Sequence, residues 1–249
     1  MRNLIYGLFL LAIVGCRAPL GAPAVQPRIY NVDDTHDPDA TVTTATTDVA
    51  TLIAPYKAQL DERMNRVLAT LAAPLKKGSP ESTLGNWTAD LTLAAARTLY
   101  PDRKIAFATL NSGGLRVQEI GAGPLIVSEV YELMPFDNEL VLMELSGRLL
   151  TEFVSHIANS GGWPVSAGLS VSKAGGKLKV LVDGQPVNPT ATYTVALPDY
   201  VANGGSNSAM LEGKPQLKSG RLLRDLWLEE AAKATGPITV TTDGSRFRL

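Results

Sequence analysis

The feature that most constrains the fold of this chain is a short apolar run that ends in a pair of glycines. Residues 105–110, Ile-Ala-Phe-Ala-Thr-Leu, are almost continuously apolar, and Asn111-Ser-Gly-Gly-Leu-Arg116 follows them. A short, bounded and partly aromatic apolar run predicts a buried strand. Gly113 and Gly114 allow the backbone after this strand to turn and to approach a ligand closely. Arg116 adds a planar cation at the lip of the turn, which suits phosphate or carboxylate.

Two later segments have a related composition. Pro135-Phe-Asp-Asn138 places an aromatic ring beside polar residues, and Asp199-Tyr-Val-Ala-Asn-Gly-Gly-Ser206 places another before a second glycine pair. Two aromatic rings and two glycine turns around one arginine are suited to a flat ring that carries a phosphate. An alternative stays open at this point, because Phe136 and Tyr200 are also residues that a hydrophobic core uses.

The composition limits the chemistry available to the chain. The formal net charge is −1, so bulk charge does not attract nucleic acid, and the only histidines and cysteine are His36, His156 and Cys16. Zinc sites, dinuclear hydrolase centres and cysteine nucleophiles draw on these residue types. Asp34-Thr-His36 has the D-x-H form that can begin a phosphatase metal site, but no apolar strand precedes it. We therefore predict no catalytic residue, no metal ligand and no cofactor in this chain, and we interpret His156 as structural.

The N-terminal residues predict export and lipidation. Residues 1–16 combine Arg2, an apolar stretch too short to span a bilayer, and Val14-Gly-Cys16, an ending that resembles a bacterial lipobox. The alternative is an ordinary secretory signal with a stray cysteine. With lipid on Cys16, residues 17–49 would form a disordered tether rich in Pro, Ala, Thr and Asp. The expected location is the cell envelope, on the periplasmic or extracellular face. Arg17 and not Asp follows Cys16, which is compatible with sorting of the lipoprotein to an outer membrane.

Residues 50–249 are expected to form one domain of the α+β class, with a mixed sheet flanked by helices. An apolar spacing of three and four predicts a helix over 60–71, and an alanine-rich segment predicts a second helix that reaches Tyr100. Further helices are expected over about 128–134, 148–158 and 222–233. Strands are expected over 105–110, 140–145, 193–197 and 238–242, with a hairpin over 178–187 around Asp183-Gly184.

Taken together, the motifs resemble the C-terminal, substrate-binding domain of 5′-nucleotidases over about residues 50–249. The landmarks occur in the same order and at similar spacing as in that family. They are Glu81-Ser-Thr-Leu-Gly-Asn86, Ala89-Asp90, Asn111-Ser-Gly-Gly-Leu-Arg116, Pro135-Phe-Asp-Asn138, the Ser146-Gly147 turn, Val165-Ser-Ala-Gly168 and Tyr200-Val-Ala-Asn-Gly-Gly205.

The resemblance implies a role for each residue of a substrate-binding pocket. Phe136 and Tyr200 would sandwich the base, Arg116 would hold phosphate and Asn138 would contact the base edge. The remaining expected pocket residues are Asn111, Gly113, Gly114 and Ser206.

The sequence departs from the family pattern at two places near this pocket. Ser206 stands where the family has an Asp for the ribose hydroxyls. Where the family usually carries further arginines, the chain has Pro74 and Gly78, with Lys76 and Lys77 close by. A lysine supplies a point charge and not the fork of an arginine, so the grip on phosphate is expected to be weaker.

In the family that this sequence resembles, a separate metallophosphatase domain carries out the hydrolysis. The resemblance includes no such domain here, so we expect one of two functions. The first is the nucleotide-binding half of a split 5′-nucleotidase, in which a separate metallophosphatase subunit holds divalent metals and hydrolyses the phosphate ester. The second is a non-catalytic nucleotide- or nucleoside-binding lipoprotein for scavenging or sensing. A module whose pocket has decayed is a third alternative.

Overall fold

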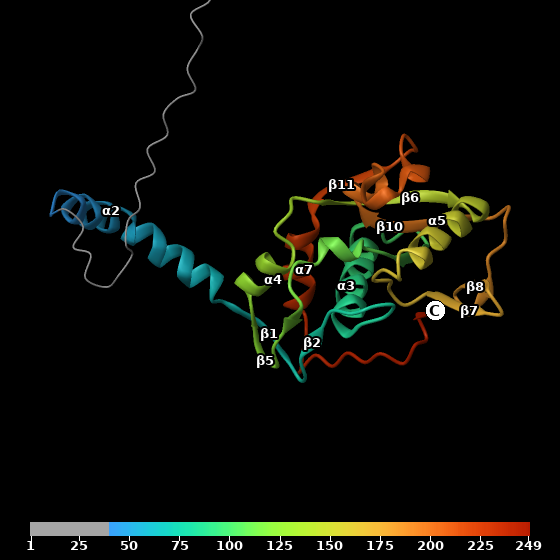
Figure 1. Cartoon of the computed structure of the whole chain (residues 1–249), viewed down its shortest axis with the longest axis horizontal. Helices are drawn as coiled ribbons and strands as arrows, with labels where there is room; N and C mark the ends of the chain where they lie inside the picture. The colour runs from blue at the N-terminus through green and yellow to red at the C-terminus, as the bar shows by residue number, and fades with distance from the viewer. Residues whose placement is uncertain (1–39) are drawn as a thin grey trace, which may run out of the picture. The chain divides into compact units, whose positions relative to one another are not determined.

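The computed structural model describes the backbone of residues 40–249 and the side chains of residues 48–249 other than Ala174 (Figure 1). Contacts divide the chain after Ile53, and residues 54–249 form one compact unit. The predicted leader, the lipid-bearing Cys16 and the Asp34-Thr-His36 motif lie outside the described residues. No helix of the described part is both long and apolar enough to cross a bilayer.

The central sheet has four strands in the order β11-β6-β10-β3. Antiparallel pairs join β6 to both β11 and β10, whereas β10 and β3 run parallel. The sheet is therefore mixed, as predicted. Its strands are β3 (Ile105–Ala108), β6 (Glu139–Ser146), β10 (Thr192–Pro198) and β11 (Leu217–Leu222).

Helices cover both faces of the central sheet. Leu140, Leu142 and Ala196 pack into a core with residues of α3 (Thr83–Leu99) and α7 (Leu223–Ala231). Val141, Met143 and Val195 point the other way and pack with α5 (Gly147–Asn159). Both faces are buried, which is why these strands are almost wholly apolar and do not alternate with polar residues. Figure 1 shows α3 beside α7 and α5 next to β6 and β10.

Three smaller sheets complete the unit. The second four-stranded sheet has the order β12-β7-β8-β9, and two-stranded ribbons pair β1 with β5 and β2 with β4. The predicted hairpin is confirmed as β8 and β9, joined by Asp183 and Gly184, which both have positive φ. The remaining strands are β1 (Val67–Leu71), β2 (Leu75–Lys76), β4 (Glu119–Ile120), β5 (Gly123–Ile126), β7 (Leu169–Ala174), β8 (Lys177–Val182), β9 (Gln185–Pro186) and β12 (Phe247–Arg248).

The predicted helices over 128–134, 148–158 and 222–233 are confirmed within a few residues. Helix α3 starts at a capped end, where the Ser82 hydroxyl accepts a hydrogen bond from Gly85 N at 3.1 Å. The helices not yet given are α2 (Ala40–Met64), α4 (Val127–Leu133), α6 (Asp199–Ala202) and the short 3₁₀ turns η1 (Ser112–Gly114), η2 (Gly205–Asn207) and η3 (Ala209–Leu211).

The prediction of a helix over 60–71 is wrong beyond Met64. Residues 67–71 form β1, which pairs with β5 and has a register irregularity between Val67 and Ala69. This irregularity turns Leu68 and Leu71 to the same side, so that both are buried although they are three residues apart. A bulged strand therefore produced the spacing that is typical of a helix. Helix α2 also begins at Ala40, so residues 40–49 are helical and not part of an irregular tether.

The predicted strand over 238–242 is also wrong. Ile238 makes only an isolated bridge to Leu71, donating to Thr70 O at 2.8 Å and accepting from Ala72 N at 2.9 Å. The chain then continues to β12, whose Phe247 pairs with Val171 of β7. The C-terminal strand β12 is therefore an edge strand of the second sheet.

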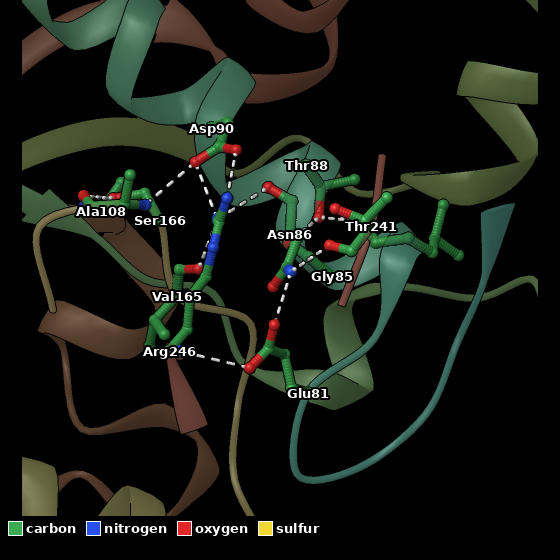
Figure 2. Close-up of polar contacts among 12 residues, drawn as sticks. Glu81, Gly85, Asn86, Thr88, Asp90, Ala108, Val165, Ser166, Thr241 and Arg246 are labelled. Atoms are coloured by element: carbon green, nitrogen blue, oxygen red, sulfur yellow. Dashed lines mark hydrogen bonds and ion pairs between the residues drawn. The ribbon is translucent and has the colours of Figure 1, made fainter. Parts of the chain in front are cut away.

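A polar network fastens this C-terminal segment to helix α3 (Figure 2). Arg246 makes two hydrogen bonds to Asp90, at 2.8 and 2.7 Å, and donates to Val165 O at 3.1 Å. Glu81 accepts from the backbone N–H of Arg246 and from the Asn86 side chain, at 3.2 and 2.9 Å. The landmark residues at 81–90 thus act as an anchor for a strand that lies more than 150 positions later.

Candidate functional site

Four separate segments meet around one cavity of about 290 Å³. The loop after β3, the loop before β6, helix α6 and turn η2 supply its lining. The lining residues are Asn111, Gly113, Gly114, Arg116, Phe136, Asn138, Tyr200 and Ser206. The structure therefore brings together all eight residues that the sequence predicts for a pocket.

Two aromatic side chains form walls of this cavity and remain open to solvent. Phe136 is 40% exposed and Tyr200 is 48% exposed, whereas the aromatic residues Phe107 and Phe153 of the core are fully buried. An exposed aromatic ring at a cavity offers an apolar face to a planar ligand. This exposure argues against the alternative that Phe136 and Tyr200 are core residues.

Arg116 supplies the one charged side chain among the eight lining residues. Its guanidinium carbon lies 5.4 Å from the centre of the Phe136 ring, and Nη1 donates to Gly113 O at 3.4 Å. Lys77 does not line the cavity, but its Nζ donates to Leu115 O at 2.7 Å, next to Arg116. Lys76 instead pairs with Glu119 at 3.5 Å on the exposed surface. The Lys77 ammonium therefore lies against the backbone segment that carries Arg116.

The turn after β3 is held by a buried asparagine and by a neighbouring loop. Asn111 is 6% exposed, and a Cβ added at Gly114 would lie 3.0 Å from Asn111 Oδ1, so a glycine allows this close packing. Leu110 N and the Thr109 hydroxyl each donate to Pro164 O at 3.0 Å. Because Arg246 contacts the same loop at Val165, the C-terminal network also supports this side of the cavity.

The turn that carries Ser206 has an unusual backbone. Ser206 and Asn207 have φ values of 53° and 62°, in the left-handed region that non-glycine residues seldom adopt. The Tyr200 hydroxyl accepts from Ser206 N at 3.2 Å, and His156 Nε2 lies 2.9 Å from Ser206 O. Since a carbonyl oxygen only accepts, His156 Nε2 carries the hydrogen and donates it to Ser206 O. Hydrogen bonds on both sides of Ser206 thus stabilise the strained turn.

Gly205 lies against the Tyr200 ring. A Cβ at this position would clash with the carbonyl oxygen of Tyr200 and come within 2.5 Å of its Cε1. Any side chain at residue 205 would therefore displace the ring from the wall of the cavity.

Sequence reasoning missed the residues that support the lining from behind. One carboxylate oxygen of Asp199 accepts from Glu139 N at 3.0 Å and from Tyr200 N at 2.8 Å, which joins the two aromatic segments. Helix α7 contributes Arg224, which contacts the loop of Phe136. His156 is structural, as predicted, and packs edge-on against Trp163 at 5.4 Å. The contacts of Asp199 with Glu139, of His156 with Ser206 and of Arg224 with Met134 join residues 50 to 90 positions apart, so no local pattern in the sequence marks them.

Comparison with known families gives the family of the chain. The family described as 5′-nucleotidase, C-terminal domain, matches residues 66–213, which is more than half of the 249 residues. The chain belongs to this family. The resemblance and the fold class inferred from the sequence are therefore confirmed.

The match with curated relatives covers only a small part of the length of each relative. Protein UshA of Escherichia coli strain K12 is 32% identical over 114 residues, which cover 44% of this chain and 20% of the relative. The 5′-nucleotidase of Vibrio vulnificus is 30% identical over 142 residues, covering 55% of this chain and 26% of the relative. The chain thus spans about a fifth to a quarter of the length of these curated relatives.

Solved structures of the family show the same fold. The 5′-nucleotidase precursor of Thermus thermophilus matches with a TM-score of 0.67 and 25% identity, covering 83% of this chain and 43% of that one. The NAD nucleotidase of Haemophilus influenzae matches with a TM-score of 0.58 and 20% identity, covering 82% of this chain and 41% of that one.

The arrangement at the cavity is suited to binding a planar, anionic molecule. Two exposed rings can stack on a base, Arg116 can pair with an anion, and the backbone of the Gly113-Gly114 turn can approach the ligand. Within residues 48–249, His, Cys, Asp and Glu side chains form no cluster of three or more that could hold a metal ion.

Proposed function

We propose that this chain binds a nucleotide or nucleoside in the cavity between Phe136 and Tyr200. One observation carries the proposal: all eight predicted residues line a single cavity in which both aromatic rings are solvent-exposed. The base would stack on the two rings, and Arg116 would pair with the phosphate. Asn138 and Ser206, which also line the cavity, would contact the polar edges of the base and the sugar.

The binding chain would form one half of a split 5′-nucleotidase that acts in nucleotide breakdown. The family match lies in the C-terminal domain, and the chain spans about a fifth to a quarter of the curated relatives. A separate metallophosphatase subunit would hold the divalent metals and hydrolyse the phosphate ester. This chain would present the nucleotide to that subunit, with the phosphate toward Arg116.

Lipid on Cys16 would keep the binding half at the cell envelope, on the periplasmic or extracellular face. The support is the sequence ending Val14-Gly-Cys16 after an apolar stretch. A multiply acylated cysteine anchors a protein firmly, whereas a single chain gives only marginal binding. Extracytoplasmic nucleotides would then be captured close to the membrane.

Isothermal titration calorimetry of the purified protein with adenosine, AMP and a UDP-sugar tests the proposal. We expect binding of AMP and adenosine, with AMP the tighter of the two because only AMP carries the charge that pairs with Arg116. Replacing Arg116 by Ala should remove most of that preference and leave adenosine affinity nearly unchanged. The absence of heat with all three ligands would contradict the proposal.

The split-enzyme part has its own test. A metallophosphatase encoded beside this chain should hydrolyse AMP faster when the chain is added, and Phe136→Ala should reduce the stimulation. Nucleotide binding without any stimulation would support the second function, a binding lipoprotein for scavenging or sensing.

A further inference from the structure

The loop that carries Phe136 has little packing of its own. Pro135, Phe136 and Asp137 are all exposed, between the buried Met134 and the half-buried Asn138. Exposed loops with few apolar contacts open locally at low free energy. An aromatic wall on such a loop needs support from elsewhere in the fold, because a moving ring would leave the cavity without one side.

Arg224 reaches this loop from the first turn of α7. Its Nη1 lies 3.4 Å from both Met134 O and Phe136 O, and its Nη2 donates to Asp137 Oδ1 at 3.0 Å. One guanidinium thus bridges three parts of the loop. The backbone adds a fourth tie, because Leu223 N donates to Asn138 O at 2.9 Å.

The environment of Arg224 is costly for a charged group. Its side chain is 11% exposed, and its Nε is buried with no hydrogen-bond partner among the described residues, although the Asp225 carboxylate lies 3.9 Å away. The face of the Tyr131 ring lies 4.5 Å from the guanidinium carbon and partly offsets the loss of water. The Asp137 partner is 78% exposed, so that ion pair by itself stabilises little. The contacts of the guanidinium with the Met134 and Phe136 carbonyls are left as the main interactions of Arg224 with the loop. A lysine lacks the planar fork and an apolar residue has no donor, so neither reproduces them.

Helix α7 is a rigid support for these contacts. Trp227 lies one turn after Arg224, is fully buried and donates from Nε1 to the Thr92 hydroxyl of α3 at 2.9 Å. The position of Arg224 is therefore fixed by the core of the domain and not by the loop that it contacts.

We propose that Arg224 is a positioning residue that holds the Met134–Asn138 loop so that Phe136 stays at the wall of the cavity. Arg224 does not line the cavity, so it acts through Phe136 and not on the ligand. The inference rests on the proposed nucleotide site for its functional consequence. Its structural part, the restraint of the loop, holds for the empty protein.

Hydrogen exchange of the unliganded protein tests the restraint without a ligand. In Arg224→Gln, amides of residues 134–139 other than Pro135, which has no N–H, should exchange faster by about tenfold, the change expected when the open loop rises from about a tenth to about nine tenths of the molecules. Amides of β10 should be unchanged. Arg221→Gln is the matched control, because the Arg221 side chain pairs with Glu229 on the surface. If Arg224→Gln does not fold, Arg224→Lys keeps a cation beside Tyr131 but lacks the fork, and should give a smaller increase.

Adenosine titration then tests the consequence for the site. Arg224→Gln should weaken adenosine binding by about tenfold, because only the fraction of molecules with the ring in place binds. In a Phe136→Ala background the same substitution should change affinity by less than about twofold, since the residue through which it acts is gone.

The two possible failures are distinguishable. Absence of adenosine binding by the wild-type protein would overturn the proposed function, and the exchange experiment would still decide whether Arg224 restrains the loop. Exchange at 134–139 that matches wild type, or that rises equally in Arg221→Gln, would overturn the inference. An equal loss of affinity with and without Phe136 would overturn it as well.

Discussion

Replacing Arg246 by Met should destabilise the domain through the network that anchors its C-terminal segment (Figure 2). The Arg246 guanidinium makes two hydrogen bonds to Asp90, at 2.8 and 2.7 Å, and one to Val165 O at 3.1 Å. It also donates to Asn86 O at 3.4 Å. Methionine retains part of the apolar stem and removes all four bonds. Asp90 keeps one partner, because Ala167 N donates to it at 3.0 Å.

The size of the effect follows from the exposure of the pair. The Arg246 side chain is 17% exposed and that of Asp90 is 42% exposed. Hydrogen bonds to charged groups contribute about 1.5–3 kcal/mol each when buried, and exposed ion pairs about 0–1 kcal/mol. With Asp90 half open to water, we expect a loss of about 2 kcal/mol in the free energy of unfolding. In a domain of this size that loss lowers the melting temperature by about 4–8 °C.

Urea unfolding of the purified protein, followed by far-UV circular dichroism, measures this loss. The control is Arg248→Met, which removes an exposed arginine two residues away and should cost less than about 0.5 kcal/mol. Asp90→Ala combined with Arg246→Met should destabilise less than the sum of the two single changes, by about 1–2 kcal/mol. A loss for Arg246→Met no larger than that of the control, or strict additivity of the pair, would refute the reasoning.

Three further predictions concern the site, the chemistry and the anchor. Gly205→Ala should displace the Tyr200 ring and weaken adenosine binding by about the 1–3 kcal/mol that one stacking wall contributes; unchanged affinity in calorimetry would contradict the close contact described for Gly205. The purified chain with added divalent metal should not release phosphate from AMP above a mock preparation, and turnover that co-purifies with the chain and is lost in Arg116→Ala would overturn the division of labour. Cys16→Ser should release the protein from the membrane fraction or block its processing, and unchanged association and processing would refute lipidation.

The sequence predicts the lining of the cavity well because its residues lie in short, distinctive motifs. Each motif places an aromatic or charged side chain close to an apolar run, and neighbouring strands bring such positions together. Phe136 and Tyr200, 64 residues apart in the chain, line the same cavity because β6 and β10 pair along their length.

The sequence does not predict what depends on register or on long-range contacts. The irregularity in β1 gave Leu68 and Leu71 a helical spacing. The last strand of the chain is β12, which pairs with β7, and not the predicted strand at 238–242. The supporting residues Asp199, His156 and Arg224 were missed or given no role in the site, since their partners lie far away along the chain.

Paired measurements of melting and adenosine binding for Phe136→Ala and Tyr200→Ala test the nucleotide-binding proposal most directly. The two side chains are 40% and 48% exposed at the cavity, so each substitution should change stability by less than about 1 kcal/mol. Each should weaken adenosine binding by about 1–3 kcal/mol, because a stacking surface is lost. The opposite result would contradict the proposal: a loss of stability of about 3–5 kcal/mol, as for core aromatics, with adenosine affinity unchanged in the protein that remains folded.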